Sequence, residues 1–206
     1  RTRNHGVKLS DADVFLMMTQ DAMPADEYLV ERLLESMRGE KIAAAYARQL
    51  PGEDSSEAER YTRQFNYPEE SCVKTKADLP KLGVKTFFCS NVCAAYRRDV
   101  FDELGGFVNR AIFNEDMLFA AKAVEAGYGI AYAAQAKVYH SHNYTYRQQF
   151  RRNFDLGVSQ ADHPEVFAAY PSESEGIRLV KSTVAHLKGK RMWNKIPDVI
   201  IQSGFK

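Results

Sequence analysis

Apolar residues gather in short runs along the first part of the chain and predict an α/β fold. Residues 13–18 form an apolar run of the kind seen in a strand buried on both faces of a parallel sheet. Between Asp26 and Gly39 the apolar positions recur at helical spacing, with acidic residues near the start and a glycine just past the end. Residues 41–46 fit a second strand. Strand, helix and strand in this order are typical of a parallel crossover unit.

The sequence pattern predicts further helices and strands in the rest of the chain. Residues 51–82 lose periodicity, so we expect a long loop with at most short helices there. We expect Asn114 to cap a helix that Gly127 ends. The remaining expected elements are an extended stretch over 84–96, a short helix over 97–104, strands over 129–133 and 136–139, a helix over 144–157 and a basic tail over 176–206.

Composition narrows the class of protein. The 206 residues are 45% hydrophobic and 27% charged, which is typical of a globular chain with a buried core. The 28 basic and 27 acidic residues give a formal charge of only +1, which excludes a strongly basic nucleic-acid binder. We therefore expect no nucleic-acid partner.

The cysteines and the apolar runs bear on location. Cys72, Cys89 and Cys93 are an odd number without dense spacing, which favours free thiols in a reducing compartment such as the cytoplasm. A zinc site containing the last two is disfavoured, because no second tight pair accompanies them. No run approaches the roughly 18 apolar residues of a membrane span, and no signal-peptide pattern stands at the start.

Asp21 is the first candidate for chemistry. It lies where the apolar run 13–18 has stopped and a loop begins, and ligands bind at the carboxyl edge of open parallel sheets. A carboxylate there could hold a divalent cation that neutralises a phosphate-bearing substrate. Alternatively, Asp21 only begins a turn before Pro24.

Glu115 and Asp116 are the second candidate. They stand in the first turn of the helix expected after Asn114, where one of them could take a proton from a substrate hydroxyl. The alternative is structural, because the helix dipole favours negative charge at this end.

His140 and His142 are the third candidate. One residue separates them, so on a strand both side chains point to the same face, which suits a metal or phosphate site. A hydrogen-bonded pair without a ligand is the alternative.

The tail from residue 176 carries a local charge of +6, with apolar residues such as Trp193 interleaved among its basic residues. Such a stretch could lie on an anionic membrane surface, or it could be an ordinary solvated helix face. Its charged residues are Arg178, Lys181, Lys188, Lys190, Arg191, Lys195, Asp198 and Lys206.

Several segments, taken together in order and spacing, resemble the inverting family 2 glycosyltransferases of GT-A fold, in particular their bacterial rhamnosyltransferase branch. The likeness runs from Arg3 to Gly157. It is carried by Arg3-Asn4 with Gly6, Phe15-Leu16, Thr19-Gln20-Asp21-Ala22 with Pro24, Ser90-Asn91, Ala94-Ala95-Tyr96-Arg97, Leu104-Gly105-Gly106-Phe107, Asn114-Glu115-Asp116-Met117 and Val138-Tyr139-His140-Ser141-His142-Asn143-Tyr144.

The resemblance implies roles for particular residues. It makes Asp116 the catalytic base, with Glu115 beside it, and Asp21 a ligand of Mn²⁺ or Mg²⁺ together with His140 or His142. Thr19 stands where the family has the first aspartate of its Asp-x-Asp motif, so fewer carboxylates are available to bind the metal ion. Thr19, Gln20, Arg3 and Asn4 are the residues expected near the nucleotide.

The resemblance also implies an overall reading. Residues 1–157 would be the metal-site and acceptor-side part of a GT-A domain that lacks the family's first roughly 80 residues, and residues 158–206 a basic helical extension. This chain alone would then be weakly active or inactive. The fold would be a mainly parallel or mixed sheet flanked by helices. The implied partners are a nucleotide-sugar donor, with a rhamnosyl donor as first expectation, and a saccharide or lipid-linked saccharide acceptor, in the synthesis of a bacterial surface polysaccharide. Peripheral contact with the inner face of a membrane is an expectation from the basic tail alone. The rival reading is a non-catalytic module that keeps the scaffold.

Overall fold

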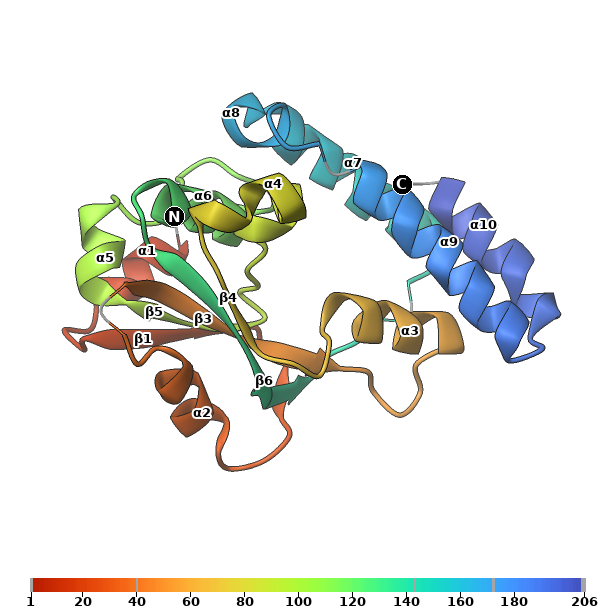
Figure 1. Cartoon of the computed structure of the whole chain (residues 1–206), viewed down its shortest axis with the longest axis horizontal. Helices are drawn as coiled ribbons and strands as arrows, with labels where there is room; N and C mark the ends of the chain where they lie inside the picture. The colour runs from red at the N-terminus through yellow and green to blue at the C-terminus, as the bar shows by residue number, and fades with distance from the viewer. Residues whose placement is uncertain (1, 40, 143, 172, 205–206) are drawn as a thin grey trace.

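The chain forms a mixed β-sheet with helices on both faces, as expected for the α/β class (Figure 1). Asn143 and Lys206, which belong to patterns noted above, lie outside the residues that this computed structural model describes. The described residues are 2–39, 41–142, 144–171 and 173–204.

Within those ranges, six strands form one sheet in the order β1-β5-β3-β6-β2, and β4 also pairs with β6. β3 and β6 are parallel, and the other pairs are antiparallel. The strands are β1 (Val14–Met18), β2 (Met23–Pro24), β3 (Ile42–Leu50), β4 (Cys72–Lys74), β5 (Cys93–Arg97) and β6 (Gly129–Tyr139).

The predicted strand-helix-strand unit is present, with one strand inserted into it. β1 is followed by β2, the helix α2 (Leu29–Ser36) and β3, and β1 and β3 run in the same direction. β5 lies between the two strands and pairs antiparallel with both. The parallel crossover is therefore confirmed, but it passes over β5, because an apolar run indicates a strand without indicating its partner.

β1 is an edge strand in the described part of the chain, not a strand buried on both faces. Phe15 and Met17 pack against the core, whereas Leu16 and Met18 on the opposite face are each 38% exposed. Residues 14–18 are all apolar, yet only one face of the strand is well covered.

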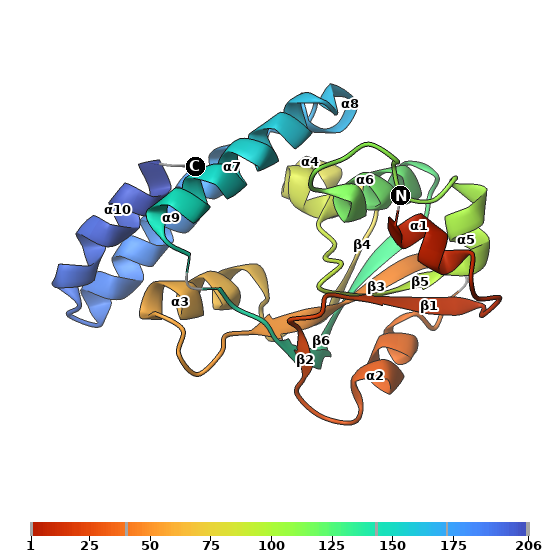
Figure 2. The same ribbon diagram turned by 180° about the vertical axis from the view of Figure 1, so that it is seen from behind.

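The central strands are the buried part of the sheet. Ala43, Ala44, Ala45, Tyr46 and Ala47 of β3 are all buried. Figures 1 and 2 show why: α2 covers one face, while α5 (Arg98–Glu103) and α6 (Glu115–Glu125) cover the other. Burial on both faces favours uninterrupted runs of small or apolar residues.

Aromatic rings fill the face beneath α5 and α6. Phe101 contacts Phe15 and Phe107 with ring centroids 4.9 Å apart in both pairs, and Tyr96 contacts Phe119 at 5.3 Å. All three pairs of rings meet edge to face or nearly so, which is a favoured aromatic geometry. This cluster fixes α6, and with it the acidic residues at its start, on the sheet.

The middle of the chain is more ordered than its pattern predicts. A ten-residue helix, α3 (Glu57–Asn66), begins at Ser56, whose hydroxyl accepts from the Glu59 backbone N–H. Residues 83–87 form a 3₁₀ turn, so only the end of the expected extended stretch, β5, is a strand. Two further short turns are the 3₁₀ helix Lys76–Asp78 and α4 (Leu79–Leu82).

The two short strands expected between 129 and 139 are one strand, β6. The register with β3 jumps from Ala47↔Ala133 to Arg48↔Lys137. Such a bulge adds residues to one strand without ending it. The polar Gln135 sits within this interruption and made the pattern look like two strands.

Helices cover the end of the chain. α7 (Tyr146–Ala161), α8 (Pro164–Phe167), α9 (Glu173–Gly189), a 3₁₀ turn (Trp193–Lys195) and α10 (Ile196–Gly204) extend away from α2, and α9 packs beside α3 (Figures 1 and 2). α7 runs without a break through residue 157, where the boundary of two regions was predicted. None of the described helices combines the length and the apolar character that a membrane span requires.

Candidate functional site

The ends of four strands meet around one cavity. β1, β3 and β6 end at the same edge of the sheet, and the segment that leads into β5 joins them there. A cavity of about 750 Å³ opens at this edge, with walls completed by α3, the start of α6 and the C-terminal helices. The predicted residues that line it are Arg3, Thr19, Asp21, Glu115, Asp116, His140 and His142.

Asp21, His140 and His142 form a cluster at one end of the cavity. Asp21 Oδ2 lies 3.6 Å from His140 Nε2 and 3.5 Å from His142 Nε2. One ligand atom from each residue lies within 4.8 Å of the others. Among the described residues, this is the group whose spacing fits a shared metal ion. The structure therefore brings together the three residues predicted as ligands.

The cluster has the protonation state of a cation site. Burial lowers the pKa of His140 to about 4, with the charge of Arg63 the next cause, and burial also lowers the pKa of His142. The Thr19 side chain lowers the pKa of Asp21, and the histidines contribute further. At neutral pH this is one carboxylate with two uncharged imidazoles, a donor set that a divalent cation can bind.

Asp116 lines the same cavity from the start of α6. Its Oδ2 accepts from the Asn91 backbone N–H at 2.8 Å, and its Oδ1 accepts from the Met117 N–H at 2.9 Å. Both bonds orient the carboxylate, which is partly buried but lines the cavity. Asp21 and Asp116 therefore share one opening to solvent.

The pKa of Asp116 rises from its ordinary value to about 6, chiefly because of burial and secondarily because of the neighbouring Glu115 charge. A carboxylate with a pKa near neutrality can take a proton in one step and release it in the next. Glu115 is held differently, since its Oε1 accepts from Asn91 Nδ2 at 2.9 Å and from the Arg3 guanidinium. Of the two acids, Asp116 has the environment of a general base.

The helix start that carries these acids is not capped as predicted. Asn114 adopts a left-handed conformation with φ of 65°, and its side chain accepts no hydrogen bond from the first turn. The Asp116 carboxylate instead accepts from the Met117 N–H of that turn. The prediction of an Asn114 side-chain cap is wrong, because in the left-handed conformation this side chain does not meet the free N–H groups.

The residues expected near the nucleotide fall into two groups. Arg3 and Thr19 line the cavity. Asn4 instead joins α1 (Thr2–Val7) to the segment after α5, donating to the Phe107 carbonyl at 2.8 Å and accepting from its N–H at 3.2 Å. Gln20 is exposed and lies outside the lining. The structure thus brings two of the four to the site.

Other polar residues of the site escaped prediction. Gln49 at the end of β3 bonds to His140, and Arg63 of α3 bonds to Gln49. Ser90 and Asn91 belong to the quoted motifs but had no assigned role. One signal could have identified Gln49. It is a polar residue just beyond the apolar part of β3, at the sheet edge where Asp21 was expected to lie. No such signal pointed to Arg63, because residues 51–82 were expected to form a long loop with at most short helices.

The three cysteines stand apart from this chemistry. All are free thiols, with Cys72 exposed and Cys89 and Cys93 buried, as the odd count predicted. Burial raises the pKa of Cys89 to about 12 and that of Cys93 to about 11, which makes both thiols unreactive.

Similarity to known sequences agrees with the geometry. Residues 1–105 match the family model "Glycosyl transferase family 2". The chain is 47% identical over 203 residues to the O-antigen chain rhamnosyltransferase RfbN of Salmonella typhimurium and 43% identical over 203 residues to WbaN of Salmonella anatum. Each match covers 97% of this chain, which spans 64% of the length of either relative.

Solved structures share the fold at low identity. The mannosyltransferase PcManGT from Pyrobaculum calidifontis, in complex with GDP-Man and Mn²⁺, aligns with a TM-score of 0.57 and 13% identity, over 98% of this chain and 64% of that one. S. aureus TarS 1-349, in complex with UDP-GlcNAc, aligns at 0.52 and 12%, over 98% and 61%. The mixed sheet with helices on both faces is therefore the GT-A fold, and the chain belongs to glycosyl transferase family 2.

Proposed function

We propose that the protein transfers a sugar from a nucleoside-diphosphate donor to an acceptor hydroxyl, with inversion at the anomeric carbon. The observation that carries this proposal is the shared cavity, which has a cation-binding cluster at one end and Asp116 at the other. A direct displacement needs a group that offsets the charge growing on the leaving diphosphate and a base that takes the proton of the acceptor hydroxyl.

Each end has a defined part in the displacement. A divalent cation, when bound by Asp21, His140 and His142, offsets the negative charge that grows on the leaving diphosphate. Asp116 accepts the proton of the acceptor hydroxyl as its oxygen attacks the anomeric carbon. The N–H groups of Asn91 and Met117 keep the carboxylate oriented through this step.

The donor set favours Mn²⁺ over Mg²⁺, because imidazole nitrogen suits the former better. The relatives are named O-antigen chain rhamnosyltransferases, so we propose a rhamnosyl donor. A saccharide, free or lipid-linked, is the acceptor that fits such a reaction.

A transfer assay tests the proposal against the rival of a non-catalytic module. The whole protein, at the length of its relatives, is incubated with Mn²⁺, a panel of nucleoside-diphosphate sugars and saccharide acceptors, and products are analysed by NMR. We expect cation-dependent donor binding and a product with inverted anomeric configuration. Donor binding without any transfer would favour the binding module, and indifference to Mn²⁺ would remove the cation site from the account.

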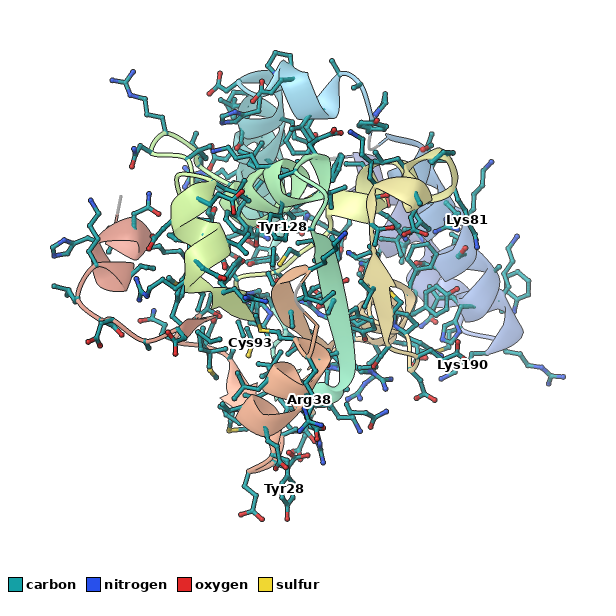
Figure 3. All side chains as sticks on the ribbon, turned by 60° about the vertical axis from the view of Figure 1, so that its left-hand side comes forward. Tyr28, Arg38, Lys81, Cys93, Tyr128 and Lys190 are labelled. Carbon is teal, nitrogen blue, oxygen red and sulfur yellow. The ribbon has the colours of Figure 1, made fainter. Side chains whose placement is uncertain are left out.

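We also propose peripheral contact with an anionic membrane at the inner face. Trp193 is 60% exposed between the ends of α9 and α10, beside Lys188, and Figure 3 shows Lys190 among these C-terminal helices. Each basic residue near an anionic surface adds roughly 1 kcal/mol to binding. Co-sedimentation with phosphatidylglycerol vesicles is expected to fall when Trp193 and Lys195 are both changed to alanine. Equal binding by the variant, or none by either protein, would contradict this contact.

A further inference from the structure

Gln49 is a buried polar side chain that the displacement itself does not use. It is 3% exposed on β3, the strand at the centre of the sheet, and lies between the two ends of the cavity. A buried primary amide must find partners for both its oxygen and its nitrogen. Its partners are the basis of the inference.

Both atoms of the amide are fully engaged. Gln49 Oε1 lies 2.6 Å from Arg63 Nη1 and 2.9 Å from His140 Nδ1. Gln49 Nε2 donates to the Tyr67 hydroxyl at 2.5 Å and to the Ser90 hydroxyl at 2.9 Å. Four partners, one directly after β6, one on α3 and two in loops, therefore meet at one side chain.

Arg63 decides which way the amide points. A guanidinium can only donate hydrogen bonds, so the Gln49 atom that faces it must be the oxygen. The same oxygen faces His140 Nδ1, which must then carry the hydrogen and donate it. It follows that His140 Nε2 has a free lone pair, directed at the side of the ring where Asp21 lies 3.6 Å away.

The second half of the amide reaches toward the base. Ser90, which accepts from Gln49 Nε2, is joined by a peptide bond to Asn91, whose N–H binds Asp116. Gln49 therefore contacts both the cation-binding histidine and the segment that orients the base. Partners that fix the orientation of a ligating histidine commonly change metal affinity 10–100-fold when removed.

We propose that Gln49 is a positioning residue that fixes His140 in the Nδ1–H tautomer and so presents Nε2 to the cation. The proposal rests on the cation site of the proposed function. It adds a residue that acts through His140 without touching the substrate.

Long-range ¹H–¹⁵N NMR of the histidine rings in the metal-free protein tests the tautomer directly. We expect protonated Nδ1 and unprotonated Nε2 for His140 in the wild-type protein at neutral pH. Gln49→Met removes the acceptor with little change in volume, and we expect it to lose this preference. Gln49→Glu keeps an oxygen toward His140 and Arg63, so it is expected to retain the Nδ1–H tautomer.

Mn²⁺ titration followed by EPR supplies the second readout. Gln49→Met is expected to weaken Mn²⁺ binding about 10–100-fold. The matched control is Tyr67→Phe, which removes a buried hydrogen bond to the other end of the same amide and is expected to leave both tautomer and affinity near the wild type.

The outcomes separate this inference from the proposed function. Wild-type protein with His140 protonated on Nε2 would overturn the role of Gln49, and this needs no variant to fold. A folded Gln49→Met with unchanged tautomer and Mn²⁺ affinity would overturn it equally. If the wild type has the expected tautomer and binds no Mn²⁺, the proposed cation site fails while the role of Gln49 in setting the tautomer stands.

Discussion

The two ends of the cavity hold the same kind of side chain in opposite electrostatic settings. Asp21 is 47% exposed, and neighbouring Thr19 and the histidines hold its pKa below the ordinary value. Asp116 is more enclosed and stands next to a second acid, so its pKa rises to about 6. One aspartate is thus kept charged, and the other is poised to exchange a proton.

The difference shows that environment, not residue type, assigns the role. A charged carboxylate suits cation binding, whereas a carboxylate that titrates near neutrality suits proton transfer. The scaffold produces the contrast by placing Asp21 in a turn after β1 and Asp116 in the first turn of α6, a helix fixed by the aromatic core.

The largest expected effect comes from removing the base. Asp116→Asn is expected to lower the rate of sugar transfer about 10²–10⁴-fold, because the acceptor hydroxyl loses its proton acceptor. Donor affinity should stay near the wild type, since the donor is bound at the other end. Single-turnover kinetics and donor titration measure the two quantities. Equal losses in both would assign Asp116 to structure instead.

Removing the cation-binding carboxylate should affect binding first. Asp21→Ala is expected to weaken Mn²⁺ and Mn²⁺-dependent nucleotide binding by about 100-fold, because one of three ligands is lost. Calorimetric titration measures this. The matched control is Asp26→Ala. Asp26 lies in the same connection between β1 and α2, but it pairs with Arg32 outside the cavity. Equal effects of both changes would show that the loss is not specific to the site.

The pH dependence of sugar transfer distinguishes Asp116 from the cation ligands. Because Asp116 acts in its ionised form, transfer should rise with pH through about 6 and then level off. The cation ligands do not add a titration above this range, since the pKa of His140 lies at about 4. Glu115→Gln should move the midpoint to lower pH, because the Glu115 charge raises the pKa of Asp116. A pH–rate profile that stays in place would contradict the coupling.

The smallest expected effect concerns the helix that supports the cation end. Ser56 caps α3, and α3 carries Arg63 to Gln49. Ser56→Ala is expected to reduce the free energy of unfolding by about 1 kcal/mol. Denaturant unfolding measures this. A loss below about 0.3 kcal/mol would show that α3 does not depend on its cap.

Local pattern was enough to predict the elements that carry the acids. The strand before Asp21 and the helix after Asn114 follow from short-range periodicity. His140 and His142 lie just beyond β6, so the prediction that they alternate along a strand is wrong, although both rings do face Asp21. Motif resemblance then joined segments more than 100 residues apart into one site, and the shared cavity agrees with it.

Pairing and long-range contacts could not be predicted in this way. The insertion of β5 between β1 and β3 depends on tertiary packing that no single segment encodes. The family resemblance made Asn4 a nucleotide contact, yet its side-chain amide is hydrogen-bonded to the backbone of Phe107. α3 was not predicted because its amphipathic pattern is short and mostly polar. Arg63, which lies on α3, was therefore missed as well.

A crystal structure of the protein with Mn²⁺ and a nucleoside diphosphate, measured at the manganese absorption edge, tests the central claim most directly. The account predicts an anomalous peak bound by Asp21 and at least one of His140 and His142, with the diphosphate between that peak and the Asp116 carboxylate. Manganese and diphosphate bound outside the cavity, or on a face that Asp116 does not share, would contradict it.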